Sequence, residues 1–195
     1  MPLLNRIRAV YHPNPLEPRA IGQLVQKFKG TIFIATPTFL RNFTRRCTPE
    51  QFATVAYVAA GAEKLPERVR NEFFERFGIM PCEGFGATEL APAVSVNLPD
   101  CVSPGFFERR LRHGSIGRPM PGQSVRIVDP DTGEVLPQGM PGLLQVKGPN
   151  VMAGYLDKPE KTASVVQDGW YSTGDIAVLD VDNFITITDR IARFR

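Results

Sequence analysis

The first stretch whose residue types suggest chemistry is "EGFGATELAP", residues 83–92. Gly86 allows the backbone to approach a ligand closely, and Phe85 offers a flat face on which a purine can stack. Thr88 presents a hydroxyl suited to a phosphate oxygen, and Glu89 presents a hard carboxylate suited to Mg²⁺. The alternative is a tight turn with a capping threonine and a surface glutamate, because short motifs often match by accident.

Three further stretches carry the same ambiguity. "YSTGD" ends in Asp175, which is either a turn former or an acceptor for ribose hydroxyls. "TDRIARFR" contains Arg190, which is either a surface charge or a donor to a phosphate or ribose oxygen. "AAGAEKL" contains Gly61, which serves either a ligand or the geometry of a strand-to-helix turn.

The elements that must position these residues alternate in the first half of the chain. Apolar runs typical of buried strands alternate there with helical patterns. The predicted strands are residues 31–35, 54–61 and 79–86, and the predicted helices are residues 20–28, 39–46 and 66–78, with "TPT" as a turn. This alternation predicts an α/β fold, a parallel sheet with crossover helices, in which ligands bind at the carboxyl ends of the strands.

The pattern changes near residue 103, so we expect an α/β part over residues 1–103 and a β-subdomain over residues 104–195. In the second part, "SVRIVDPDTGEVLPQG" predicts a hairpin turning at Asp131–Gly133, and "GWYSTGDIAVLDVDNFITITDR" predicts one turning at Asp182–Asn183. A further strand, "GLLQVKG", and a short helix lie between the two hairpins. Short strands at regular spacing predict a small β-barrel-like subdomain.

Composition excludes several classes of protein. The 195 residues carry 23 Lys+Arg against 20 Asp+Glu, and a net charge of +3 with scattered charges argues against nucleic acid as a partner. Three cysteines at long spacings, without a CxxC pair, favour a reducing, cytoplasmic compartment. His12 and His113 both lie in predicted turns, which does not favour a catalytic role. No apolar run approaches the roughly 18 residues of a membrane span.

Taken together and in order, the four motifs resemble the core motifs of the adenylate-forming superfamily. The matching stretches are "AAGAEKL", "GFGATEL", "VKGPNVMAGYLDKPEKTASVVQDGWYSTGD" and "ITITDR", which together extend over most of the chain. More narrowly, "VYHPNPLEPRAIG", "ATPTFLRNF" and "GAEKLPERV" resemble the acyl-ACP synthetase part of the bifunctional 2-acylglycerophosphoethanolamine acyltransferase/acyl-ACP synthetases. Such a relative would lie in the cytoplasm or at the inner membrane.

The resemblance implies a two-step reaction. A fatty acid carboxylate attacks the α-phosphorus of ATP to give acyl-adenylate and pyrophosphate, and the thiol of coenzyme A or of an acyl carrier protein then displaces AMP. It implies that Thr88 meets the α-phosphate and Glu89 holds Mg²⁺, that Phe85 stacks on adenine, and that Asp175 and Arg190 meet the ribose. The implied nucleotide-binding set is Gly61, Ala62, Glu63, Phe85, Gly86, Ala87, Thr88, Asp175 and Arg190.

Two parts of the family pattern are expected outside these residues. They are a Ser/Thr/Gly-rich phosphate loop with a lysine, upstream, and a small C-terminal domain with a catalytic lysine, downstream. By position Ala192 would be the hinge, where many members carry a polar residue, while Leu143 and Asp189 replace a common Glu and Gly. We therefore expect a fragment that has no ligase activity alone and that associates with itself through unpaired strands.

Three other functions stay open at this point. The chain could be a nucleotide-binding module that performs no chemistry, or part of a ligase for a non-fatty carboxylic acid. A phospholipid acyltransferase is a third alternative, but its His-x4-Asp motif does not occur in this sequence.

Overall fold

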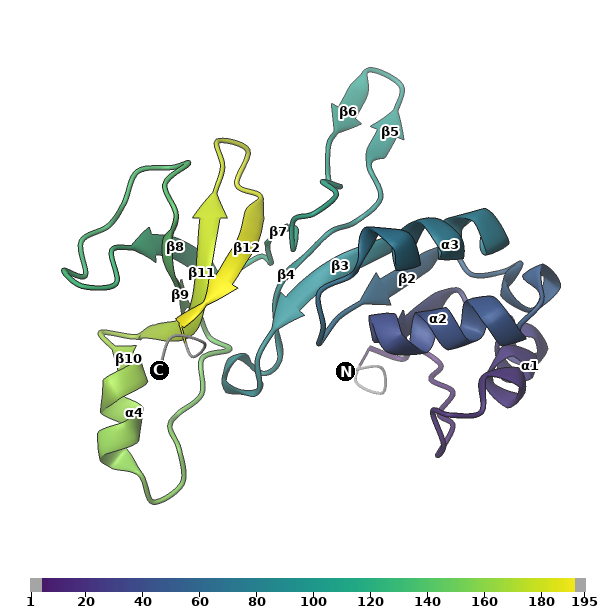
Figure 1. Cartoon of the computed structure of the whole chain (residues 1–195), viewed down its shortest axis with the longest axis horizontal. Coiled ribbons are helices and arrows are strands. Elements are labelled where there is room, and N and C mark those ends of the chain that lie inside the picture. Colours follow the sequence, from purple (N-terminus) through teal and green to yellow (C-terminus); the bar gives the residue numbers. More distant parts are fainter. Residues whose placement is uncertain (1–4, 192–195) are drawn as a thin grey trace. The chain divides into compact units, whose positions relative to one another are not determined.

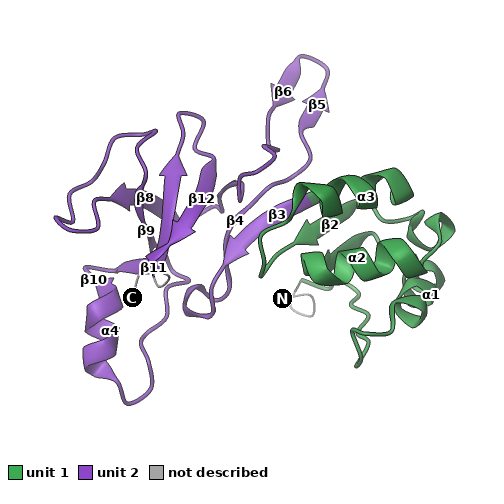
Figure 2. Cartoon of the chain, viewed as in Figure 1, with its two compact units in different colours: residues 1–81 green, residues 82–195 purple. Residues whose placement is uncertain are grey.

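The structure is a computed structural model that describes residues 5–191 (Figure 1). The chain forms two compact units, residues 1–81 and residues 82–195, which Figure 2 colours separately. The expected change of fold type at residue 103 stays a prediction, and Ala192 lies outside the described residues.

Unit 1 alternates helices and strands as the sequence predicts. Its elements are α1 (Pro18–Phe28), β1 (Ile32–Ala35), α2 (Pro37–Arg46), the 3₁₀ helix η1 (Pro49–Phe52), β2 (Tyr57–Ala60) and α3 (Glu67–Phe77). β1 and β2 pair in parallel, with Ile32 opposite Tyr57 and Ala35 opposite Ala60, so the predicted parallel pairing with a helical crossover is confirmed.

Two of the sequence predictions for unit 1 are wrong. The predicted "TPT" turn is the start of α2, because the Thr36 side chain accepts a hydrogen bond from the Phe39 amide and Pro37 begins the helix. The predicted strand over residues 54–61 begins only at Tyr57, and η1 precedes it. α3 instead ends as predicted, at Gly78 with φ of 70°.

The core of unit 1 is a cluster of aromatic rings between the helices and the β1–β2 pair. Phe33 and Phe43 meet edge to face at 5.0 Å between ring centroids, and Phe52 and Phe73 do so at 6.0 Å. Phe77 completes the cluster at 4.6 Å from both Phe52 and Phe73. Such pairs add stability beyond the area that the rings bury, and through Phe33 they hold β1 against α2 and η1.

Two adjacent phenylalanines of α3 provide a matched test of this core. Phe73 is 0% exposed and Phe74 is 44% exposed. We expect Phe73→Ala to lower the free energy of unfolding by about 3–5 kcal/mol, since it leaves a cavity, and Phe74→Ala to lower it by less than about 1 kcal/mol. Urea unfolding followed by circular dichroism measures both values. Equal losses of unfolding free energy would contradict the finding that Phe73 faces the core and Phe74 faces solvent.

Unit 2 contains a small antiparallel sheet, a hairpin and a larger sheet. The small sheet has β3 (Pro81–Gly86), β4 (Ala93–Val96) and β7 (Arg118–Pro119), with β4 antiparallel to both of its partners. The 3₁₀ helix η2 (Thr88–Leu90) connects β3 to β4. β5 (Cys101–Ser103) and β6 (Phe106–Glu108) form the separate hairpin.

The larger sheet is built around one long strand, β11 (Trp170–Leu179). β11 pairs with β9 (Gly142–Lys147), with β10 (Val166–Gln167) and with β12 (Ile185–Arg190), and β9 pairs with β8 (Ser124–Val128). α4 (Pro159–Val165) leads into β10. The pairing order does not close, so this mixed α/β fold contains no closed barrel among its described residues.

Both predicted turns of this region are present, but only one joins two full strands. The Asp182–Asn183 turn connects β11 to β12, and Asn183 adopts φ of 64°. At the other turn the Asp129 carboxylate accepts the Asp131 and Thr132 amides, yet the returning arm makes a single bridge through Val135. The second arm of that predicted hairpin is therefore wrong as a strand, because β8 pairs with β9 instead.

Among the helices of residues 5–191, none combines the length and apolar character needed to cross a bilayer.

Candidate nucleotide and metal site

The loop between β3 and β4 is folded around Gly86. A Cβ atom added there would lie 1.9 Å from the carbonyl oxygen of Pro92, and the Ala87 amide donates to that same oxygen at 2.8 Å. The fully buried Leu90 anchors η2 in the core of unit 2. Thr88 is exposed, and its hydroxyl makes no hydrogen bond to another described residue. The loop thus presents Thr88 and Glu89 at the surface of a tightly closed turn.

Glu89 is held by residues that follow it by more than sixty positions. Its carboxylate Oε1 accepts a hydrogen bond from the Tyr155 hydroxyl at 2.8 Å, and its backbone carbonyl accepts the Met152 amide at 2.8 Å. The pKa of Glu89 lies below its usual value because of its own backbone amide first, then the Tyr155 hydroxyl and the charges of Lys161 and Arg190. Glu89 is therefore a fixed, ionised carboxylate near two cations.

Asp175 and Arg190 lie opposite each other on β11 and β12. Asp175 Oδ1 is 3.6 Å from Arg190 Nε, and Asp175 is only 7% exposed, whereas the Arg190 side chain is 63% exposed. Burial raises the pKa of Asp175, while Arg190 and the Thr173 hydroxyl oppose that rise. A largely buried acid beside an exposed cation suits recognition of a diol.

Of the two interpretations left open for "YSTGD", the turn is not observed. Asp175 lies inside β11, where Gly174 adopts φ of 78° and the pairing with β9 shifts between Ser172 and Ile176. The Thr173 hydroxyl accepts the Asp175 amide and donates to the Leu144 carbonyl, which secures the irregular strand. This is a β-bulge, a feature that re-aims a side chain within a sheet and occurs often beside active sites.

Two tyrosines that the sequence reasoning did not single out join these groups. Besides Tyr155, Tyr171 of β11 is buried, and burial raises its pKa, as do the nearby charges of Glu89 and Asp175. Tyr171 also interacts with Tyr155. Both residues lie in the motif "VKGPNVMAGYLDKPEKTASVVQDGWYSTGD", which was the available signal. Glu89, Tyr155, Tyr171, Asp175 and Arg190 therefore form one polar cluster in unit 2.

Phe85 and Ala87 contribute to packing as well as to the surface. Both are half-buried and pack against the core cluster that contains Leu90 and Val146. Part of the Phe85 ring is therefore committed to this core. Its role toward a purine stays a prediction.

The residues Gly61, Ala62 and Glu63 follow β2 in unit 1. Ala62 takes the left-handed conformation, with φ of 68°. The Glu63 carboxylate accepts a hydrogen bond from the Thr38 hydroxyl of α2 at 2.8 Å. Their predicted role beside adenine stays a prediction, because it requires residues of both units.

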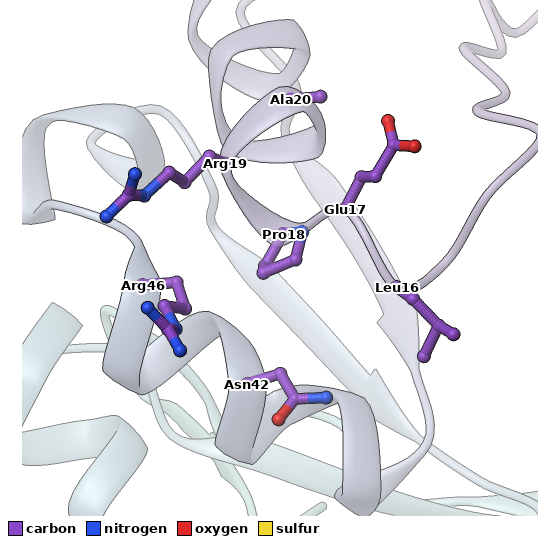
Figure 3. Close-up of a pocket in the computed structure, with 7 residues that line it drawn as sticks. All are labelled: Leu16, Glu17, Pro18, Arg19, Ala20, Asn42 and Arg46. Carbon is purple, nitrogen blue, oxygen red and sulfur yellow. The ribbon is translucent and has the colours of Figure 1, made fainter.

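Unit 1 also contains a shallow pocket between the start of α1 and α2, lined by residues that include Arg19, Asn42 and Arg46 (Figure 3). None of the predicted site residues lines it. The Glu17 carboxylate at its rim accepts a hydrogen bond from Asn14.

The donor set in unit 2 fits Mg²⁺ of the kind that a nucleotide brings. Within residues 5–191, no group of three or more His, Cys, Asp or Glu side chains could enclose a metal ion. Mg²⁺ usually keeps several waters and binds one or two carboxylates together with substrate phosphates. A single ionised carboxylate, Glu89, beside the free Thr88 hydroxyl agrees with that mode of binding.

Comparisons with known proteins point to one enzyme family. The family model described as AMP-binding enzyme matches residues 1–156. A long-chain-fatty-acid–CoA ligase of Escherichia coli O6:H1 is 40% identical over 139 residues, which are 71% of this chain and 23% of that protein. A 4-coumarate–CoA ligase of Pinus taeda is 32% identical over 173 residues, 87% of this chain and 32% of that protein.

Among solved structures, apo MatB from Rhodopseudomonas palustris superposes with a TM-score of 0.84 at 29% identity and covers 97% of this chain. The same protein has also been solved with ATP bound, and that structure superposes with a TM-score of 0.81. The match covers 36% of the MatB chain. The present chain thus spans only a minor part of the length of its relatives.

Proposed function

We propose that this chain, which belongs to the AMP-binding enzyme family, forms the adenosine- and magnesium-facing part of an ATP-dependent acid–thiol ligase. The observation that carries the proposal is the polar cluster of unit 2, in which an ionised Glu89 and a buried Asp175 both lie near Arg190. A site for a magnesium-bound nucleoside triphosphate can use one carboxylate for the metal ion and a second acid for the ribose diol.

Each residue has a distinct task in this proposal. Asp175 accepts hydrogen bonds from the two ribose hydroxyls, and Arg190 donates to ribose or phosphate oxygens. Thr88 donates its hydroxyl to the α-phosphate. Gly61, Ala62 and Glu63 border the adenine and acyl sites, and the exposed part of Phe85 lies against the adenine.

Glu89 would hold Mg²⁺. When bound, the metal neutralises charge on the phosphates while the carboxylate of the acid substrate attacks the α-phosphorus. The residues of this chain supply orientation and fixed charge, and none of them needs to transfer a proton. Attack at a phosphoryl centre depends mainly on positioning and electrostatic stabilisation, which rigid groups such as the Glu89 carboxylate supply.

For the acid, we propose a fatty acid, because the E. coli relative is named for a long-chain fatty acid and for coenzyme A. An acyl carrier protein is the alternative acceptor, supported only by the resemblance of "GAEKLPERV" and its neighbours to acyl-ACP synthetases. The 4-coumarate–CoA ligase similarity keeps an aromatic acid as a second candidate.

Calorimetric titration with AMP tests the proposal on the 195-residue chain. We expect wild type to bind AMP and Asp175→Ala to bind it about 10–100 times more weakly, because two hydrogen bonds to a charged acceptor are lost. A non-hydrolysable acyl-adenylate analogue should lose affinity by a similar factor.

Asp182→Ala is the matched control, since Asp182 lies on the same hairpin and pairs with Arg112 rather than with Arg190. That variant should bind AMP as wild type does. If wild type is folded by circular dichroism and binds neither ligand, or if Asp175→Ala binds both unchanged, the proposed function is wrong for this part of the chain.

A further inference from the structure

The segment from Gly148 to Thr162 holds the η2 turn at three points. The Asn150 side-chain amide donates to the Leu90 carbonyl at 2.7 Å, and the Met152 amide donates to the Glu89 carbonyl at 2.8 Å. The third point is the 2.8 Å hydrogen bond from the Tyr155 hydroxyl to Glu89 Oε1. Two contacts fix the backbone of the turn, and only the Tyr155 contact reaches the carboxylate itself.

Tyr155 is itself fixed from two sides. Its backbone amide donates to the Thr162 hydroxyl at 2.9 Å, which ties it to the first turns of α4. The ammonium group of Lys161 lies 4.6 Å from the centroid of the Tyr155 ring, within the range of a cation–π contact. A donor held in this way has a defined direction, so it can orient the group that accepts its hydrogen bond.

The hydrogen bond from Tyr155 makes the two oxygens of the Glu89 carboxylate inequivalent. Oε1 is occupied by Tyr155, whereas Oε2 accepts no hydrogen bond from another residue in the described part of the chain. Without Tyr155 only the backbone amide of Glu89 itself would hold the carboxylate, so its orientation would be less firmly fixed. With it, one oxygen is held and the other is directed away from the tyrosine.

We propose that Tyr155 is a positioning residue that aims Glu89 Oε2 at the metal ion of a bound magnesium nucleotide, an inference that rests on the proposed function. Groups that hydrogen-bond to a metal ligand orient it, and their loss commonly weakens metal binding by about 10–100-fold. The role differs from a purely structural one, because it acts only on ligands that bring a metal ion.

The test compares ATP binding at increasing Mg²⁺ with AMP binding in the absence of metal, both by calorimetry on the 195-residue chain. In Tyr155→Phe, we expect the Mg²⁺ concentration for half-maximal ATP binding to rise by about 10-fold. Excess Mg²⁺ should restore binding, and metal-free AMP binding should change by less than about twofold.

A double-mutant cycle identifies the group through which Tyr155 acts. In a Glu89→Ala background, adding Tyr155→Phe should change ATP binding by less than about twofold, since the oriented carboxylate is already absent. Lys158→Ala is the control and should match wild type, because only the backbone of Lys158 is hydrogen-bonded to Tyr155 and Thr162 and the replacement leaves that backbone in place.

The possible results separate the two claims. Loss of Mg²⁺-dependent binding that persists in the Glu89→Ala background, or equal loss of AMP and ATP binding, would make Tyr155 structural and overturn the inference. Unchanged ATP binding by Tyr155→Phe would overturn it as well, with the proposed function intact. A wild-type chain that binds neither nucleotide would overturn both.

Discussion

Replacing Gly86 by alanine is expected to open the loop that carries Thr88 and Glu89 of the proposed nucleotide site. The new Cβ would lie 1.9 Å from the Pro92 carbonyl oxygen, 2.8 Å from the Pro92 carbonyl carbon and 3.0 Å from Ala93 Cα. These are backbone atoms, so no side-chain rotation can relieve the overlap. The loop between β3 and β4 must open, and Thr88 and Glu89 lie within it. We expect AMP and magnesium–ATP affinity to fall by at least about 10-fold and unfolding free energy to fall by about 3 kcal/mol.

Gly84 in the same strand is the matched control. A Cβ there would lie 3.3 Å from the Ser95 carbonyl oxygen and 3.6 Å from the end of the Val96 side chain, so small shifts suffice. Both replacements reduce the conformational freedom of the unfolded chain equally. A difference in stability between the two variants therefore reports the steric overlap in the folded state. Gly84→Ala should keep nucleotide binding and lose less than about 1.5 kcal/mol by urea unfolding. If Gly86→Ala bound AMP as wild type does, the closed form of the loop would be wrong.

The elements that sequence alone predicts well are those whose signals are local. The repeat of apolar residues gives α1 and α3, Gly78 ends α3 in the left-handed region, and Asn183 turns β11 into β12. Alternation of strand and helix predicts that β1 and β2 are parallel, because a crossover through α2 allows little else.

The bulge at Asp175 shows where local signals fail. Ser-Thr-Gly-Asp has the composition of a turn, and an isolated peptide of that sequence would form one readily. In the protein, β9 pairs with β11 both before and after Gly174, β12 pairs with it from Asp175 onward, and the Thr173 hydroxyl accepts the Asp175 amide. Tertiary pairing therefore extends the strand through residues that locally favour a bend.

In the site, too, the sequence does not predict which residues far apart in the chain come into contact. Residue type and resemblance identify Thr88, Glu89, Asp175 and Arg190, whereas Tyr155 lies in a matching motif that gives it no partner. It lies 66 residues from Glu89 in the sequence, and nothing in "MAGYLDKP" indicates which acid its hydroxyl meets. A residue type predicts what a side chain can do, but the partner comes only from the fold.

The second large effect is expected for Glu89→Gln. Glutamine keeps the shape of the side chain and a carbonyl oxygen that can accept the Tyr155 hydrogen bond, so η2 should stay folded. It removes the negative charge that Mg²⁺ requires, next to the positive charges of Lys161 and Arg190. We expect Mg²⁺-dependent ATP binding to weaken by about 100-fold, since oxygen ligands of a hard cation act mainly through charge.

AMP without metal should bind Glu89→Gln at least as well as wild type, because Asp175 and Arg190 are unchanged and one acid near the phosphate is gone. This opposite response of the two nucleotides is what separates a metal ligand from a structural glutamate. Glu160→Gln, an exposed acid in the first turn of α4, controls for the loss of one charge and should leave both titrations unchanged. If calorimetry gave the same ATP affinity for Glu89→Gln as for wild type across the Mg²⁺ series, Glu89 would not hold the metal.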